Sequence, residues 1–202
     1  MVAIAQACHS DRIRADVAVV IADTPRAGGI ARAREMGLDT RIVDRHSLQR
    51  DGRPDRDAFE EELAATIEAR RADFVILAGF MRVLSAGFVA RYAGRMLNIH
   101  PSLLPRHKGL DTHARALAAG DTEHGASVHF VTPELDGGPL IAQAVVPIAA
   151  GEDVASLSGR VHAAEHKLYP MVIEWLTCGR LDWNGGHPLL DGAPLVAPAR
   201  IN

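Results

Sequence analysis

Short apolar segments alternate along this chain with segments of helical periodicity, and this alternation is the feature that most restricts the fold. Strands are predicted at residues 17–22, 40–43, 74–78, 96–99, 127–131 and 140–146. Helices are predicted at residues 28–36, 57–70, 112–119 and 153–177. The stripe expected to bury the last helix comprises Val154, Leu157, Val161, Leu168, Val172 and Trp175. Alternation of strands with helices predicts an α/β fold with a doubly wound, mostly parallel sheet.

The length and composition restrict the class of protein. A chain of 202 residues favours a single domain, with a core at residues 1–179 and a tail at residues 180–202. The longest apolar runs, such as residues 74–80, are too short to cross a bilayer. The net charge of −3 and the dispersed basic residues exclude an obvious nucleic-acid surface. Cys8 and Cys178 form no metal or redox spacing, so we expect a cytoplasmic protein without a disulfide framework.

Three chemically complementary side chains occur at predicted strand ends or in loops. Asn98 and His100 lie at the end of the strand at residues 96–99, and Asp136 lies in the loop after residues 127–131. A histidine beside an aspartate can carry a proton near neutral pH, and an asparagine amide can donate to an oxyanion. This set suits acyl transfer, although ordinary loop hydrogen bonds would also explain such residues. Because the set contains no activated Ser or Cys, we expect direct transfer to an outside nucleophile.

Three separated motifs make this chemistry more specific. They read LAGFMRVL at residues 77–84, NIHPSLLP at 98–105 and SVHFVTPELDGGP at 127–139. Their order and sequences resemble the folate-dependent formyltransferases, in particular the branch that acts on glycinamide ribonucleotide. The resemblance runs from about the first ten residues to the region of Trp175. It implies a Rossmann-like formyltransferase fold and formyl transfer from 10-formyltetrahydrofolate, as co-substrate, to the amine of glycinamide ribonucleotide in purine biosynthesis.

The resemblance also implies which residues act. Asn98 and His100 would stabilise the tetrahedral oxyanion, while Asp136 would keep His100 charged and oriented. The positions that would contact the folate are Arg56, Met81, Arg82, Val83, Leu84, Asn98, Thr132, Pro133, Glu134, Leu135 and Asp136. From the residues alone, core packing after a strand is an equal interpretation of Met81 and Val83. A solvated charge before a helix is nearly as good an interpretation of Arg56.

Two interpretations apply to the segment around Glu165 and His166. His162, Glu165 and His166 match the inverted zinc-protease pattern H-x-x-E-H, which would make the chain a metal-dependent hydrolase. The motif is short, and no convincing helix follows to supply the expected acidic ligand. The resemblance instead implies that Glu165 and His166 bind the ribose or glycinamide portion of the nucleotide, without a metal. We favour this second interpretation.

The beginning of the chain differs from the family pattern. Members of the family open with a strand and a Gly-Ser-rich loop that holds a phosphate at a helix N-terminus. Residues 1–8 instead resemble the second half of the helix that follows this loop. We therefore expect either a true start further upstream, which we favour, or a truncated form with weak phosphate binding.

Other functions use the same three residues with a different acceptor. Formyltetrahydrofolate hydrolases use water, and the formylases of initiator tRNA and of amino sugars share the Asn-His-Asp set. A non-catalytic folate-binding module is an alternative of another class. The sequence shows neither the regulatory domain of the hydrolases nor the C-terminal domain of the tRNA enzymes, so we favour transfer to a small amine.

Overall fold

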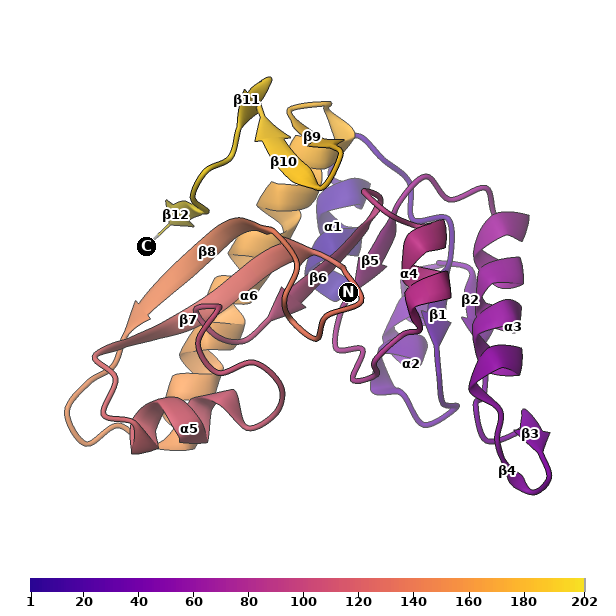
Figure 1. Ribbon diagram of the computed structural model, residues 1–202, viewed down its shortest axis with the longest axis horizontal. Coiled ribbons are helices and arrows are strands. Elements are labelled where there is room, and N and C mark those ends of the chain that lie inside the picture. Colours follow the sequence, from indigo (N-terminus) through magenta and orange to yellow (C-terminus); the bar gives the residue numbers. More distant parts are fainter. Residues whose placement is uncertain (202) are drawn as a thin grey trace. The chain divides into compact units, whose positions relative to one another are not determined.

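The computed structural model describes residues 1–201 and divides into two units (Figure 1). The first unit comprises Met1–Asp11 and Ala15–Asp73, and the second comprises Arg12–Arg14 and the chain from Phe74 onward. Each unit contains two sheets of its own, and the α/β class predicted from the sequence is confirmed.

The first unit combines short strands with three helices. Its elements are α1 (Val2–His9), β1 (Val20–Ala22), α2 (Gly28–Glu35), β2 (Thr40–Ile42), β3 (Gln49–Arg50), β4 (Arg53–Pro54) and α3 (Arg56–Ala69). Strands β1 and β2 pair in parallel, whereas β3 and β4 form a small antiparallel hairpin. Helix α3 begins where the Asp55 carboxylate accepts the backbone N–H groups of Asp57 and Ala58. Its apolar residues Phe59, Leu63 and Ile67, spaced four positions apart, are buried on one face.

The second unit is built on a five-stranded sheet with the order β12-β8-β7-β6-β5. Its elements are β5 (Val75–Leu77), α4 (Ala86–Arg91), β6 (Met96–His100), α5 (Thr112–Ala118), β7 (Glu123–Phe130), β8 (Leu140–Pro147), α6 (Val154–Thr177), β9 (Leu181–Asn184), β10 (His187–Leu190), β11 (Ala193–Pro194) and β12 (Ala199–Ile201). The pairs β5–β6 and β8–β12 are parallel, whereas β6–β7 and β7–β8 are antiparallel. The sheet is therefore mixed, and β12, which belongs to the tail at residues 180–202, forms one of its edges.

Helix α6 packs against β7 and β8 and runs across one face of the sheet (Figure 1). Leu157, Val161, Leu168 and Val172 from the predicted stripe are fully buried. Val154 was wrongly included, because it lies in the first turn of the helix and its side chain remains 45% exposed. The Tyr169 hydroxyl reaches the sheet, where it bonds to the backbone oxygens of Leu77 and Leu97.

Strand β7 begins four residues earlier than the sequence predicts, at Glu123 instead of Ser127. The prediction missed this part because it contains His124 and Gly125, which break the apolar alternation. Gly125 is needed for close pairing with β8, since a Cβ there would lie 1.9 Å from the backbone oxygen of Ala144. No helix in the described part of the chain has the length and apolar character needed to span a membrane.

Candidate active site

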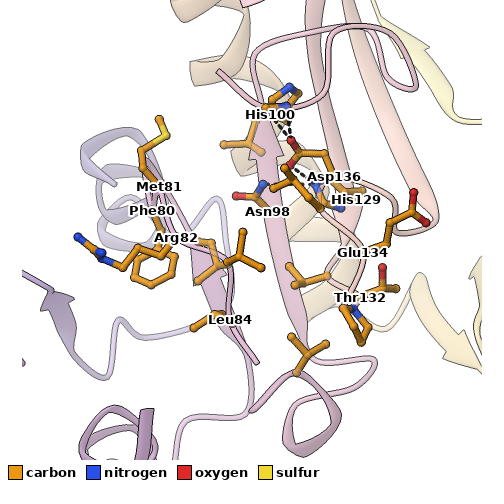
Figure 2. Close-up of a pocket in the computed structure, with 18 of the residues that line it drawn as sticks. Phe80, Met81, Arg82, Leu84, Asn98, His100, His129, Thr132, Glu134 and Asp136 are labelled. Atoms are coloured by element: carbon orange, nitrogen blue, oxygen red, sulfur yellow. Dashed lines mark hydrogen bonds and ion pairs between the residues drawn. The ribbon is translucent and has the colours of Figure 1, made fainter. Parts of the chain in front are cut away.

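The candidate site lies where β5 and β6 end at the same edge of the sheet. Because these neighbouring strands are parallel, the loops that follow β5 and the last residues of β6 meet there. A cavity of about 300 Å³ opens at this edge (Figure 2). Its walls come from residues 77–84, from the end of β6, from residues 109 and 110, and from the segment 131–136 that follows β7.

His100 is held between two acceptor oxygens. Its Nδ1 lies 3.3 Å from the Oδ2 atom of Asp136, and both side chains are 8% exposed. Its other ring nitrogen, Nε2, lies 3.0 Å from the backbone oxygen of His107. An imidazolium carries an N–H on both ring nitrogens, and here each nitrogen faces an oxygen that can accept. The two oxygens therefore suit the imidazolium form and hold the ring in one orientation.

A backbone hydrogen bond and an uncommon backbone conformation also help to fix the Asp136 carboxylate. The same Oδ2 atom accepts the backbone N–H of Gly109 at 2.9 Å. The backbone of Asp136 has a φ of 46°, in the left-handed region that few residues other than glycine occupy. Such conformations concentrate at functional sites because the surroundings must hold them in place. The second carboxylate oxygen, Oδ1, lies 3.9 Å from Nε2 of His129.

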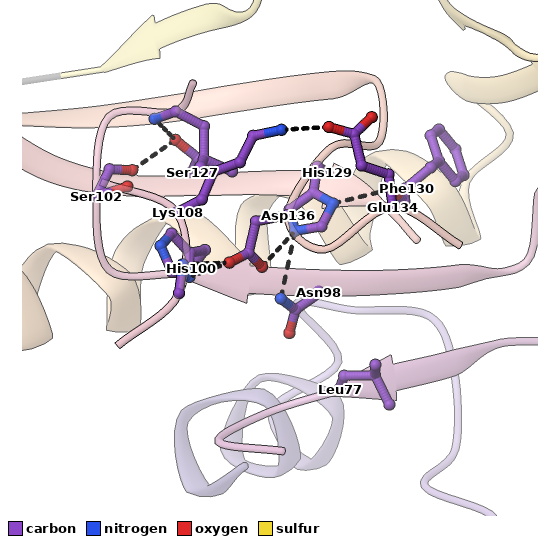
Figure 3. A network of polar contacts seen from close by, with 12 residues as sticks. Leu77, Asn98, His100, Ser102, Lys108, Ser127, His129, Phe130, Glu134 and Asp136 are labelled. Atoms are coloured by element: carbon purple, nitrogen blue, oxygen red, sulfur yellow. Dashed lines mark hydrogen bonds and ion pairs between the residues drawn. The ribbon is translucent and has the colours of Figure 1, made fainter. Parts of the chain in front are cut away.

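His129 orients the Asn98 amide, as Figure 3 shows. The two residues face each other across the antiparallel β6–β7 pair, with 3.3 Å between Asn98 Nδ2 and His129 Nε2. His129 Nδ1 lies 2.9 Å from the backbone oxygen of Phe130, so Nδ1 carries the ring proton and Nε2 accepts from Asn98. Burial lowers the pKa of His129, which favours this neutral form. Sequence reasoning assigned no role to His129; its signals were its place in the strand after Ser127 and in the motif at residues 127–139.

More histidines lie near the loop that follows β6. His113 Nδ1 lies 3.0 Å from Nε2 of His124, and burial lowers the pKa of His113 and lowers that of His124 to about 4. His107 Nε2 lies 2.8 Å from the Oδ2 atom of Asp121. The hydrogen bond from His107 lowers the pKa of Asp121, and Arg106 acts in the same direction. The side chains of Arg106 and His107 thus attach the loop after β6 to Asp121, while the backbone oxygen of His107 faces His100.

Most of the predicted folate-contacting residues come together around the cavity. The lining includes Asn98, Asp136, Met81, Arg82, Val83, Leu84, Thr132, Pro133, Glu134 and Leu135. Met81 is 72% exposed and Val83 is 55% exposed, so core packing does not explain either side chain. Leu84, in contrast, is buried. The exposed apolar groups give the cavity a rim that suits a flat, partly apolar ligand.

The remaining predicted residues do not line this cavity. Arg56 belongs to the first unit, where its Nε lies 3.9 Å from Oε1 of Glu60. Glu165 lies on α6 with its Oε2 3.1 Å from Nδ1 of His162, and burial raises the pKa of Glu165. His166 is exposed, with its ring centroid 4.1 Å from that of His162. Among the described residues, no group of three or more potential ligands is arranged to hold a metal ion.

Two adjacent glycines shape the loop that carries Asp136, and they allow a matched test. A Cβ at Gly138 would lie 1.8 Å from the backbone oxygen of Phe130, whereas the three atoms nearest to a Cβ at Gly137 belong to the movable side chain of Glu134. We expect Gly138→Ala to lower the free energy of unfolding by about 1–3 kcal/mol, because the backbone must move. Gly137→Ala should cost clearly less. Urea unfolding of both variants measures the difference, and equal losses would contradict this account of the loop.

Comparison with known proteins identifies the family of the chain. Residues 1–173 match the formyl transferase family model. The chain is 48% identical over 193 residues to phosphoribosylglycinamide formyltransferase of Escherichia coli, covering 96% of this chain and 89% of the relative. The enzyme of the same name from Haemophilus influenzae is 40% identical, with 98% and 92% covered. The solved phosphoribosylglycinamide formyltransferase of Coxiella burnetii superposes with a TM-score of 0.92 at 42% identity, covering 100% of this chain and 93% of that one. Sequence, fold and site together therefore place the chain in the formyl transferase family.

Proposed function

We propose that this enzyme transfers the formyl group of 10-formyltetrahydrofolate to the amine of 5′-phosphoribosylglycinamide, a step of purine biosynthesis. One observation carries the proposal: Asn98, His100 and Asp136 line one cavity in a chain of the formyl transferase family. The reaction forms a C–N bond to the glycinamide amine and breaks the bond between the formyl carbon and N10 of the folate. The electron pair of the broken bond stays on N10, which takes up a proton.

The rim of the cavity supports binding of the folate. Exposed Met81, Val83 and Leu135 offer apolar contact to the flat rings, while the segment from Thr132 to Asp136 offers backbone groups to the pterin. We assign Arg82, Leu84, Pro133 and Glu134 to the same binding surface because they line the same cavity. Arg56 is proposed as a further folate contact on the family resemblance alone.

Asn98 supplies a hydrogen-bond donor for the oxyanion, and His100 supplies a positive charge beside it. The Asn98 amide already gives one N–H to His129, which leaves its second N–H for the oxygen of the tetrahedral intermediate. The imidazolium of His100 stabilises the same negative charge by its proximity. Both side chains are held by fixed partners, so little reorganisation is needed when the charge develops.

Asp136 has two tasks that use different oxygens. Its Oδ2 fixes His100 and is itself fixed by the Gly109 N–H. Its Oδ1 can accept a proton from the attacking amine, directly or through one water, and return it toward N10. Holding the amine, the formyl carbon and the carboxylate in line supplies much of the remaining rate enhancement.

The proposal also covers the residues that bind the nucleotide and the compartment in which the enzyme works. Glu165, with a pKa raised by burial, and the adjacent His166 are proposed to bind the ribose or glycinamide portion of the substrate. No metal takes part in the proposed reaction. The free cysteines Cys8 and Cys178 support a reducing compartment, and we assign the enzyme to the cytoplasm on this ground and by the pathway of its relatives.

An assay of tetrahydrofolate release distinguishes the candidate acceptors. The purified chain is given 10-formyltetrahydrofolate with glycinamide ribonucleotide, with water alone, or with an amino sugar. We expect release that depends on glycinamide ribonucleotide and matches the amount of formylated product. Equal release in water alone would identify a hydrolase, and folate binding without release under any condition would identify a binding module. Either result would overturn the proposal.

A further inference from the structure

Strand β8 carries a buried glutamine that the reaction described above does not use. Gln143 is 3% exposed and lies between the small apolar residues Ala142 and Ala144. Its Nε2 donates to the backbone oxygen of Leu104 and to Oγ of Ser127, each at 2.9 Å. A buried amide is costly unless it is hydrogen-bonded, so its place in an otherwise apolar strand calls for a specific task.

Ser127 continues the same network from the neighbouring strand. Its fully buried hydroxyl donates to the backbone oxygen of Ser102 at 2.7 Å and accepts the backbone N–H of Leu104 at 3.0 Å. With the bond from Gln143, this oxygen has three partners. Ser102 in turn donates its hydroxyl to the backbone oxygen of Arg106 at 2.7 Å. Figure 3 shows Ser102 and Ser127 alongside the residues of the candidate site.

These bonds fix the segment that determines the orientation of His100. The segment starts at His100 and returns to it, because the backbone oxygen of His107 faces His100 Nε2. Gln143 and Ser127 hold the segment at residues 102 and 104, and Ser102 holds it at residue 106, next to that oxygen. Hydrogen bonds joined by short stretches of backbone thus connect the sheet interior to His100, whose Nδ1 faces Asp136.

We propose that Gln143 and Ser127 are positioning residues of this enzyme: through the backbone of residues 102–107 they place the His107 carbonyl that orients His100. The inference rests on the proposed function, because its consequence is measured on formyl transfer. Both side chains are buried and neither lines the cavity, so we expect neither to contact the substrates. Their effect should appear in the chemical step and leave substrate binding nearly intact.

The test combines Gln143→Leu with a change of His100. Leucine keeps most of the volume and removes both donors. In the parent enzyme, Gln143→Leu should lower kcat by about 10-fold, since small misplacements of catalytic groups are costly, with KM for both substrates changing less than about 2-fold. In a His100→Ala background the same change should have almost no further effect on kcat, because the group that it positions is absent. Ser127→Ala should behave in the same way, and the effects of the two changes should not be additive.

Ile141→Val is the matched control. Ile141 lies on the same strand and is fully buried. Its hydrocarbon side chain cannot hydrogen-bond to residues 102–107. The substitution should lower the melting temperature while kcat stays within about 2-fold of the parent. An equal fall in kcat in the parent and the His100→Ala background, or an unchanged kcat in folded Gln143→Leu, would overturn the inference. A parent enzyme without transferase activity would instead refute the proposed function.

Discussion

Changing Asp136→Asn is expected to lower kcat by about 10²–10³-fold, the usual cost of losing one preorganised electrostatic group. Asparagine has nearly the same shape and can still accept the Gly109 N–H. It has no negative charge to pair with the His100 imidazolium and no basic oxygen to receive the proton of the attacking amine. Because the pterin is proposed to be recognised mainly by backbone groups, folate affinity should change little. Steady-state kinetics with both substrates and a direct folate titration measure these two quantities.

Asp153→Asn provides the control for this change. The Asp153 carboxylate caps α6 by accepting the N–H of Ser156 at 2.8 Å, a task that asparagine performs equally well. The same chemical change should therefore leave both kcat and stability close to the parent values. Near-parental turnover in Asp136→Asn would show that the carboxylate charge is not used in the reaction. A parallel loss of folate binding would show that the variant has lost the loop geometry.

The folded enzyme is expected to lose stability in mild acid, before its carboxylates protonate. Burial lowers the pKa of His124 to about 4 from an ordinary 6.5, so the folded state binds fewer protons than the unfolded state between these values. This contribution is complete above pH 6.5 and is lost as the pH falls toward 4. A shift of this size corresponds to about 3 kcal/mol. Lowered pKa values of His113 and His129 act in the same direction.

Denaturant unfolding at pH values from 7.5 to 4.5 measures this loss. His124→Gln removes the titrating group, so its free energy of unfolding should vary less with pH over this range, even if the variant is less stable at pH 7.5. His187→Gln changes an exposed histidine and should leave the pH dependence as in the parent. Identical pH dependence in His124→Gln and the parent would show that His124 is not the source.

The sequence predicted the elements well where a single pattern governs them. The periodic burial of Phe59, Leu63 and Ile67 and the strand that carries Asn98, Met96–His100, follow from local side-chain chemistry. Two predictions were wrong because tertiary position overrides the apolar pattern. Val154 lies at the end of a helix, where it stays exposed, and β7 extends to Glu123 because Gly125 allows close pairing with β8. Sheet order could not be deduced in the same way, since the β6–β7–β8 antiparallel pairs depend on contacts between distant segments.

By itself the sequence determined the family and the α/β class, and it pointed to Asn98, His100 and Asp136 as candidate residues, because motifs of consecutive residues carry this information. Only the tertiary structure decided how the three groups are held. His129 meets Asn98 through strand pairing, and the His107 carbonyl meets His100 through a chain segment that folds back on itself. Gln143, 43 positions beyond His100 in the sequence, joins the same network from the sheet interior. Hydrogen bonds depend on distance and direction in space, so residues that orient a catalytic group leave no local pattern in the chain.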